Sequence, residues 1–406
     1  MKTKRVLFRD IVVGGEGLLR GPFGSDLKKS LYVPKSVNTY KVYLQENILK
    51  KDKSKGAHHI SKEYYDSKMS RYKVKNGDFI VTCDGTLGEI FQLKDIEEDG
   101  IISSSLLRIT LDKSQVSDIF FPYFWKSRIK DPLIRSHDNS VLKHLPGVKA
   151  IREFEIDLPA LNEQKKIAKI LSTLDAKIEL NNKINNKLES MAKLIYDYWF
   201  VQFDFPDENG RPYKSSGGKM IYNEELKREI PEGWKVELVA NILANESLGG
   251  KIASSEYLNK GEIPIIDQSS SFICGYTNDK SKRIVTKVPR IIFGDHTRRL
   301  KLINFDFARG ADGTQVLLSK EAKVPQHLFY HCLLKIDLSN YGYARHFKFL
   351  KDSKIIIPDL NTASKFEEKA KLWYNLILAN IKQNKKLAEL RDWLLPMLMN
   401  GQVTVK

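Results

Sequence analysis

The stretch "KIELNNKINNKLESM", from Lys177 to Met191, decides the fold of this chain. It has the composition of a long helix, yet four asparagines interrupt it, and two of them fall where an apolar seam should run. Asparagine is a poor helix former because its side chain competes with the backbone for hydrogen bonds. Its repeated use within one helix therefore needs a structural reason.

The same pattern returns 199 residues later in "NLILANIKQNKKLAEL", from Asn375 to Leu390. The match runs without a gap from Glu155 and Lys354 onwards, and both copies contain a Pro-x-Leu-Asn sequence. A repeat of this kind indicates a duplicated unit. Proline cannot lie in a helix interior and asparagine is a good N-cap, so we expect the helices to begin near Asn162 and Asn361.

Both copies carry a heptad seam, in which core residues are alternately four and three positions apart. Asparagines occupy the same two successive core positions in each copy. An antiparallel pairing sets Asn181 against Asn384 and Asn185 against Asn380, with apolar residues in nearly every other layer. These four asparagines are our candidates for setting the register of the helix pair, because a slip would strand an amide against hydrocarbon.

Some features of the seam are less regular. One layer places Leu174 opposite Arg391, and Pro396 predicts a kink or a frayed end in the second helix. Asn182 and Asn186 fall off the seam. The alternative interpretation is that all of these asparagines are exposed on imperfect helices.

The segments that flank the helices alternate β-rich runs with turn signals. In each, a loop with Gly and Asp follows an apolar strand, and an aromatic helix opened by Pro122 or Pro325 comes next. We therefore expect an α+β protein, with two pseudo-repeated α/β domains separated by two long antiparallel coiled-coil helices. The predicted boundaries are 1–158 for the first domain, 159–203 for the first helix, 204–233 for a connector, 234–358 for the second domain, and 359–406 for the second helix and tail.

Composition narrows the class of protein. The chain has 67 Lys and Arg against 50 Asp and Glu, and a net charge of +17 suggests a nucleic-acid partner, although a generally lysine-rich composition would look the same. Cys83, Cys274 and Cys332 lie far apart without a CxxC, which argues against a zinc module or a disulfide framework. No run approaches a membrane span and no signal peptide is evident, so we expect a cytoplasmic protein.

Catalytic signatures are missing from the sequence. No Pro-Pro occurs, so the Asn/Asp-Pro-Pro-aromatic motif of DNA amino-methyltransferases is absent, and "GGKM" and "GGKI" lack the Ser or Thr of a Walker A loop. Pro358-Asp359 with Glu367 and Lys369 loosely resembles a nuclease signature, but Glu367 and Lys369 fall in the seam-bearing helix. We expect no catalytic residues and no metal site.

Several motifs, in order, resemble the specificity subunit of type I restriction-modification systems. They are "GPFGSDLKK", "LPALNEQKKIAKILSTLDAKIELNNKINNKLE", "FDFPDENGRPYKSSGGKM" with "IPEGW", and "LRDWLLPMLMNGQV". The resemblance covers essentially the whole chain in the family's order of target-recognition domain, helix, second recognition domain and second helix. One motif alone would be weak, whereas the ordered set is highly specific.

The resemblance implies a DNA-binding subunit that is not itself an enzyme. Such subunits bring two adenine-N6 methyltransferase subunits to a bipartite asymmetric target on double-stranded DNA, and restriction subunits, which translocate and cut DNA, join for cleavage. The partner subunits would use S-adenosylmethionine, ATP and Mg, and this chain would bind no cofactor. The paired helices would act as a ruler between the half-sites and as the dock for the methyltransferase subunits.

Base-reading residues are expected on basic and polar loops, because Arg and Lys recognise guanine, Asn and Gln recognise adenine, and Lys or Arg contacts phosphate. The densest candidate is "GDHTRRLK" in the second domain, for which a solvated basic turn is the alternative. The predicted DNA-binding residues are Ser25, Lys28, Lys29, Arg71, Lys73, His137, Asn139, Ser140, Lys143, His144, His296, Thr297, Arg298, Arg299, Lys301, Tyr343, Arg345, His346 and Lys348.

Two other functions stay open at this point. The chain could be a single-chain DNA methyltransferase or nuclease with an unrecognised site, in which case it would modify DNA unaided. It could also be a coiled-coil adaptor that binds protein only, in which case it would show no DNA affinity even with its partner bound.

Overall fold

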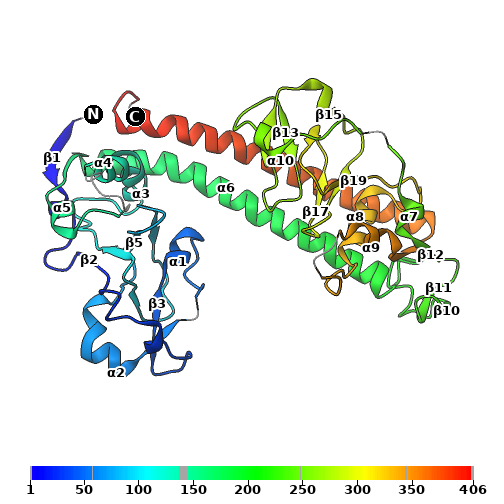
Figure 1. The fold of residues 1–406 in the computed structure, drawn as a ribbon, viewed down its shortest axis with the longest axis horizontal. Coiled ribbons are helices and arrows are strands. Elements are labelled where there is room, and N and C mark those ends of the chain that lie inside the picture. The colour runs from blue at the N-terminus through cyan, green and yellow to red at the C-terminus, as the bar shows by residue number, and fades with distance from the viewer. Residues whose placement is uncertain (1, 57, 137–143, 247, 343–344, 404–406) are drawn as a thin grey trace. The chain divides into compact units, whose positions relative to one another are not determined.

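The computed structural model describes residues 2–56, 58–136, 144–246, 248–342 and 345–403. The chain divides into two compact units, one formed by Met1–Ile178 with Lys385–Lys406 and the other by Glu179–Asn384. Two long helices, α6 (Leu161–Tyr196) and α10 (Leu360–Met399), each contribute one part to each unit (Figure 1).

The first unit holds two small sheets and a separate strand pair. The first sheet has the order β2-β8-β5-β6 and is antiparallel, and the second has the order β4-β3-β7, with β3 and β7 parallel. Strand β1 pairs antiparallel with β9, the strand that leads into α6. The elements are β1 (Thr3–Leu7), β2 (Leu18–Arg20), β3 (Thr39–Tyr43), α1 (Gln45–Leu49), β4 (His59–Ser61), α2 (Lys62–Tyr64), β5 (Phe79–Thr82), β6 (Ile90–Gln92), β7 (Gly100–Ile102), β8 (Leu106–Ile109), α3 (Phe121–Phe124), α4 (Lys130–Arg135), α5 (Val148–Arg152) and β9 (Glu155–Pro159).

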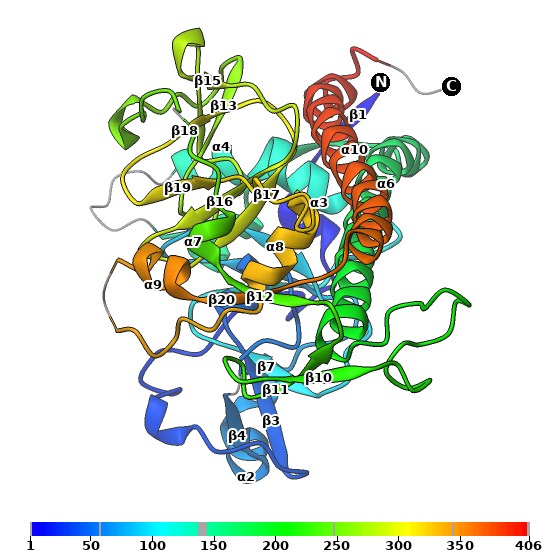
Figure 2. The same ribbon diagram turned by 90° about the vertical axis from the view of Figure 1, so that its right-hand side faces the viewer.

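The second unit has sheets of order β17-β16-β19 and β14-β13-β18-β15, and Figure 2 shows β16 between β17 and β19. A hairpin of β10 and β11 follows α6, and β12 pairs antiparallel with β20, the strand that leads into α10. The elements are β10 (Met220–Asn223), β11 (Arg228–Pro231), β12 (Lys235–Leu238), α7 (Val239–Ile242), β13 (Ile263–Ile266), β14 (Gly275–Thr277), β15 (Arg283–Ile284), β16 (Arg290–Gly294), β17 (Leu300–Ile303), β18 (Phe307–Arg309), β19 (Thr314–Leu317), α8 (Gln326–Leu334), α9 (Phe347–Asp352) and β20 (Lys354–Ile357).

The two units repeat one strand topology. Strand β5 pairs with β6 and β8 in the first unit, as β16 pairs with β17 and β19 in the second. The parallel pair β3 and β7 corresponds to β13 and β18, and each parallel pair carries an antiparallel neighbour. This order agrees with the prediction that the flanking segments are diverged copies of one domain.

The long helices begin close to the predicted residues, but their caps differ from the prediction. Asn361 lies inside the first turn of α10, and the preceding Asp359 is the cap, since its carboxylate accepts hydrogen bonds from the Thr362 backbone N–H (2.8 Å) and hydroxyl (2.7 Å). Asn162 likewise lies inside α6. The first backbone hydrogen bond of this helix is donated by the Gln164 N–H to the Ala160 carbonyl. The predicted asparagine caps are therefore wrong.

The end of α10 also corrects the prediction. Pro396 lies inside the helix, which continues to Met399, and the Asn400 N–H donates to the Pro396 carbonyl at 2.9 Å. Leu395 and Leu398 on this last turn are buried in the core of the first unit. Tertiary packing thus holds a helical turn that the proline alone would weaken.

Both cores contain large aromatic side chains among their aliphatic ones. Phe79, Phe121 and Trp125 are fully buried in the first unit, where the α6 residue Leu171 also packs. In the second unit a π-helical turn at Asp197–Val201 extends α6 and brings Trp199 and Phe200 against Phe366 of α10, with ring centroids 6.3 and 5.2 Å from it. Each domain is therefore fixed to its part of the helix pair through a shared core.

Candidate nucleic-acid interface

The register of the helix pair is set in the second unit by a ladder of asparagine amides. Asn181 Nδ2 donates to Asn384 Oδ1 at 2.8 Å, and Asn380 Nδ2 donates to Asn185 Oδ1 at 2.8 Å. Asn181 is 1% and Asn185 7% exposed, whereas Asn380 and Asn384 are half-buried, so each polar layer is buried on its α6 side. They are the two pairs that the sequence predicts.

The ladder is wider than predicted. Asn182, expected to lie off the seam, accepts a hydrogen bond from Asn384 Nδ2 at 2.8 Å, and Asn181 Nδ2 also donates to Gln383 Oε1 at 2.7 Å. Each long helix therefore supplies polar side chains from adjacent positions. A shift by one residue would break all of these bonds together.

In the first unit the helix pair is held by apolar and charged groups. Leu171 lies in the same core as Leu395 and Leu398. The sequence placed Leu174 opposite Arg391 with no partner for the arginine charge. In the structure the Arg391 guanidinium contacts the Asp175 carboxylate at 2.6 Å, so its charge is paired. The Tyr123 hydroxyl donates to the other oxygen of the same carboxylate at 2.5 Å, which ties the domain to the helix.

The predicted loop of the second domain turns between β16 and β17. His296, Thr297, Arg298 and Arg299 are all exposed there. The Thr297 hydroxyl donates to the Gln268 carbonyl at 2.8 Å, and Arg298 has a positive φ of 58° with its guanidinium 3.0 Å from the Leu338 carbonyl. Arg299 is therefore exposed on a turn that the hydrogen bonds of Thr297 and Arg298 hold in place.

Two other predicted residues of this domain are buried. Lys301 Nζ donates to the carbonyls of Asp267 (2.7 Å) and Ser271 (2.5 Å), and burial lowers the pKa of this amine. His346 is 2% exposed, and its ring nitrogens lie 2.9 Å from the Asp295 carbonyl and 2.8 Å from the Tyr341 carbonyl. Both side chains hold loops together in this structure, and DNA contact would require these bonds to break.

The neighbouring turn adds further predicted residues. Arg345 and Lys348 are exposed, and Asp295 Oδ1 accepts the Phe347 N–H at the start of α9 (2.8 Å), so this turn is tied to the loop after β16. Tyr343 lies outside the described residues. Arg345, Lys348 and Arg299 therefore belong to segments that the structure joins directly.

The first domain places a charge cluster on the loop after β5. Asp84 Oδ1 lies 3.0 Å from Arg20 Nη2 and 2.6 Å from His144 Nδ1, and all three side chains are between one third and one half exposed. The Gln45 side-chain amide donates to the Asp84 carbonyl at 2.5 Å. Of these residues only His144 was predicted.

Arg20 and Gln45 are thus candidates that sequence reasoning missed, together with Gln268 of the second domain. The Gln268 amide donates to the Asp312 carbonyl (2.9 Å) and accepts the His296 N–H (3.1 Å). Arg and Gln are residue types that read bases in the major groove. The only sequence signal was the Asp-Gly after β5, because the residues that gather around it come from distant segments.

The remaining predicted residues of the first domain are dispersed. Ser25, Lys28 and Lys29 are exposed on one loop. Arg71 Nε lies 3.3 Å from Glu16, and Lys73 Nζ lies 2.7 Å from Asp99, so both cations are paired. The predicted residues that lie outside the described ones are His137, Asn139, Ser140 and Lys143.

The described residues offer neither a metal site nor a membrane-spanning helix. They contain no cluster of three or more His, Cys, Asp or Glu side chains that could hold a metal ion. In the same part of the chain, no helix has both the length and the apolar character needed to cross a membrane.

Comparison with known proteins identifies similar sequences. Residues 26–190 match the model of the type I restriction modification DNA specificity domain. The chain is 27% identical to the type I restriction enzyme MjaIX specificity subunit of Methanocaldococcus jannaschii, over 81% of this chain and 78% of that protein. It is 23% identical to the MjaVIII specificity subunit of the same organism, over 93% of this chain and 90% of that protein.

A solved structure has a similar fold. The S subunit of a type I restriction-modification system from M. genitalium matches with a TM-score of 0.56 and 16% identity, over 98% of this chain and 96% of that one. The predicted α+β fold class is thereby confirmed.

Proposed function

We infer, from the similarity of this chain to type I restriction-modification specificity subunits, that it recognises DNA for such a complex and reads one half of a bipartite target with each domain. The observation that carries the finer part of this proposal is the repeated strand topology with unlike loops. The same position carries Asp84 with Arg20 and His144 in one domain, and Asp295 followed by exposed His296 and Arg299 in the other. Two readers with different side chains fit a target with two unlike halves.

We further propose that the long helices dock two methyltransferase subunits. Beside the seam, α6 exposes Met191 (47%) and Leu194 (67%), and α10 exposes Leu390 (43%) and Trp393 (57%) at the positions 199 residues later. Exposed apolar residues that lie together on a surface can mark an interaction site. The two patches occupy equivalent positions of the sequence repeat, so each could bind one copy of the same partner.

Catalysis belongs to the partners in this proposal. The methyltransferase subunits would bind S-adenosylmethionine, and the restriction subunits would bind ATP and Mg and cut DNA. The chain itself would act in the cytoplasm by holding the target, with exposed Arg and Lys contacting phosphates and bases.

The test is reconstitution with the methyltransferase subunit, followed by mapping of the methylated sites on genomic DNA. We expect no methylation by the chain alone, a bipartite motif from the complex, and DNA affinity that falls steeply with salt. Methylation by the chain alone would identify a single-chain enzyme. A complex that assembles yet has no DNA affinity would identify a protein-binding adaptor.

Residue variants make the test specific to one domain. Arg299→Ala should relax the preference in one half of the motif only, by about 1–3 kcal/mol if this guanidinium contacts a guanine. Arg20→Ala should act only on the other half. Lys369→Ala, at an exposed cation that belongs to α10 and to neither loop, should leave both halves unchanged.

A further inference from the structure

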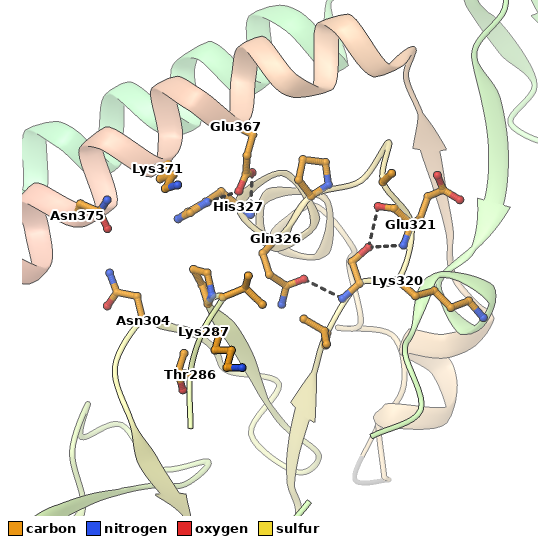
Figure 3. Close-up of a pocket in the computed structure, with 16 residues that line it drawn as sticks. Thr286, Lys287, Asn304, Lys320, Glu321, Gln326, His327, Glu367, Lys371 and Asn375 are labelled. Atoms are coloured by element: carbon orange, nitrogen blue, oxygen red, sulfur yellow. Dashed lines mark hydrogen bonds and ion pairs between the residues drawn. The ribbon is translucent and has the colours of Figure 1, made fainter. Parts of the chain in front are cut away.

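A pocket of about 450 Å³ lies in the second unit, where the ends of its central strands meet α10 (Figure 3). Its wall is formed by residues 286–289 before β16, Asn304 after β17, residues 318–322 after β19, residues 325–327 at the start of α8, and the α10 face that carries Glu367, Lys371 and Asn375. The loop with His296 and Arg299 leaves β16 at the opposite end. The pocket is therefore separate from the predicted base-reading loop.

Two buried polar atoms on residues of this wall have no hydrogen-bond partner among the described residues. They are Nε2 of His327, a side chain that is 1% exposed, and Oγ1 of Thr286. Buried polar groups are nearly always hydrogen-bonded, and each exception needs an explanation such as an unseen ligand. In Figure 3 the ring of His327 lies below Glu367, with Thr286 and Asn304 across the pocket.

The proton of the His327 ring is fixed by Glu367. Nδ1 lies 2.6 Å from Glu367 Oε1, and a carboxylate can only accept, so Nδ1 carries the hydrogen. Oε2 of the same carboxylate accepts the His327 backbone N–H at 3.1 Å. In the neutral ring Nε2 is therefore an acceptor that lacks a donor.

The pocket is also rich in uncompensated positive charge. Lys287, Lys320 and Lys371 line it, all three are exposed, and none forms an ion pair among the described residues. Glu367 is engaged by His327, which leaves Glu321 as the other acidic side chain on the wall. Such a wall favours an anion.

We propose that this pocket binds a phosphate monoester of a small molecule. The phosphoryl oxygens would accept hydrogen bonds from the lysines and Thr286. Near its second pKa of about 6, a monoester also keeps a P–OH, which can donate to His327 Nε2. Sulfate and carboxylates lack that donor, and the volume falls in the range of small-molecule sites, about 300–1,000 Å³.

The proposal is tested by titrating inorganic phosphate into the full chain at constant ionic strength, with calorimetry and ³¹P NMR as readouts. One saturable site is expected. Lys371→Ala should weaken binding by about tenfold, as expected for one hydrogen bond to a charged group, and Thr286→Val should weaken it by less. Lys369→Ala, on the same helix but outside the pocket, is the matched control and should bind as the wild type does.

His327→Gln should also weaken phosphate binding, and if this buried substitution impairs folding, the Lys371 and Thr286 variants still decide the question. Absence of saturable phosphate binding, or equal binding by the wild type and both of those variants, would overturn the site. Sulfate binding as tight as phosphate would overturn the monoester assignment. Displacement of phosphate by short duplex DNA would show instead that the occupant is a backbone phosphate.

Discussion

The two domains share a strand order but are fixed to the helix pair by different chemistry. In the first unit a tyrosine hydroxyl and an arginine hold the half-buried carboxylate of Asp175. In the second unit the contact is made by buried histidines, His327 with Glu367 and His331 with Tyr374, and asparagine amides fill the helix seam. One topology therefore tolerates either type of anchor, and the two units should respond differently to acid and to substitution.

The two units should differ most in how their stability responds to acid. His331 is 3% exposed, and its Nε2 lies 3.1 Å from the Tyr374 hydroxyl, within hydrogen-bond distance. Burial, aided by the nearby His327, lowers the pKa of His331 from 6.5 to about 4. Because the unfolded state binds this proton first, stability is complete above pH 6.5 and falls on the order of 3 kcal/mol as the pH drops to about 4.

The measurement is urea denaturation at pH 4.5 and 7, with hydrogen exchange to assign the loss to the second unit. His331→Gln, which keeps an acceptor for Tyr374 but does not titrate, should reduce the difference between the two pH values. His144→Gln, at an exposed histidine of the first unit, is the control. An unchanged difference in the His331 variant would show that other groups cause the acid loss.

The asparagine ladder should show the next largest effect. Asn181→Leu removes the hydrogen bonds of a buried amide to Gln383 and Asn384, although Asn384 keeps its bond to Asn182, with an expected loss of about 1–3 kcal/mol in the free energy of unfolding. Adding Asn384→Leu makes the layer apolar and should restore stability to at least the wild-type value, while loosening register. Denaturation curves and disulfide trapping across the helices measure the two properties; equal stability of the single and double variants would contradict the facing pair.

Substitutions in the loops after β5 and β16 should show a smaller difference in stability between the two units. Asp295 is 5% exposed and accepts the Phe347 N–H, so Asp295→Ala should cost about 1–2 kcal/mol. Asp84 makes partly exposed ion pairs with Arg20 and His144, so Asp84→Ala should cost less than about 1 kcal/mol. Thermal melts compare the two; a larger loss for Asp84 would reverse the roles assigned to these loops.

A similarly small effect is expected at the anchor of the first unit. Tyr123→Phe removes the hydroxyl from Asp175, but Arg391 still pairs with the carboxylate, so a loss of about 0.5–1.5 kcal/mol is expected. Combining it with Arg391→Met should cost more than the sum of the single changes if both groups share one carboxylate. Additive losses would argue against a shared anchor.

The sequence predicted the helices and the asparagine pairs because a seven-residue period and a repeat both constrain those positions. It missed the cap at Asp359 because both Asp359 and Asn361 are good N-cap residues, and the local sequence does not decide between them. It also treated Lys301 and His346 as surface groups, although tertiary contacts bury both. The cluster at Asp84 could not be predicted, because Arg20, Gln45 and His144 meet it only through the folding of distant segments.

The amide ladder has a consequence for how the protein works in changing ionic conditions. Its hydrogen bonds join neutral groups, so salt does not screen them and no proton is gained or lost across the physiological range. Contacts of Arg and Lys with phosphate, by contrast, weaken steeply as salt rises. Under the proposed function, a rise in salt would therefore detach the protein from DNA while the helices keep their alignment, and the same molecule would be ready to bind again.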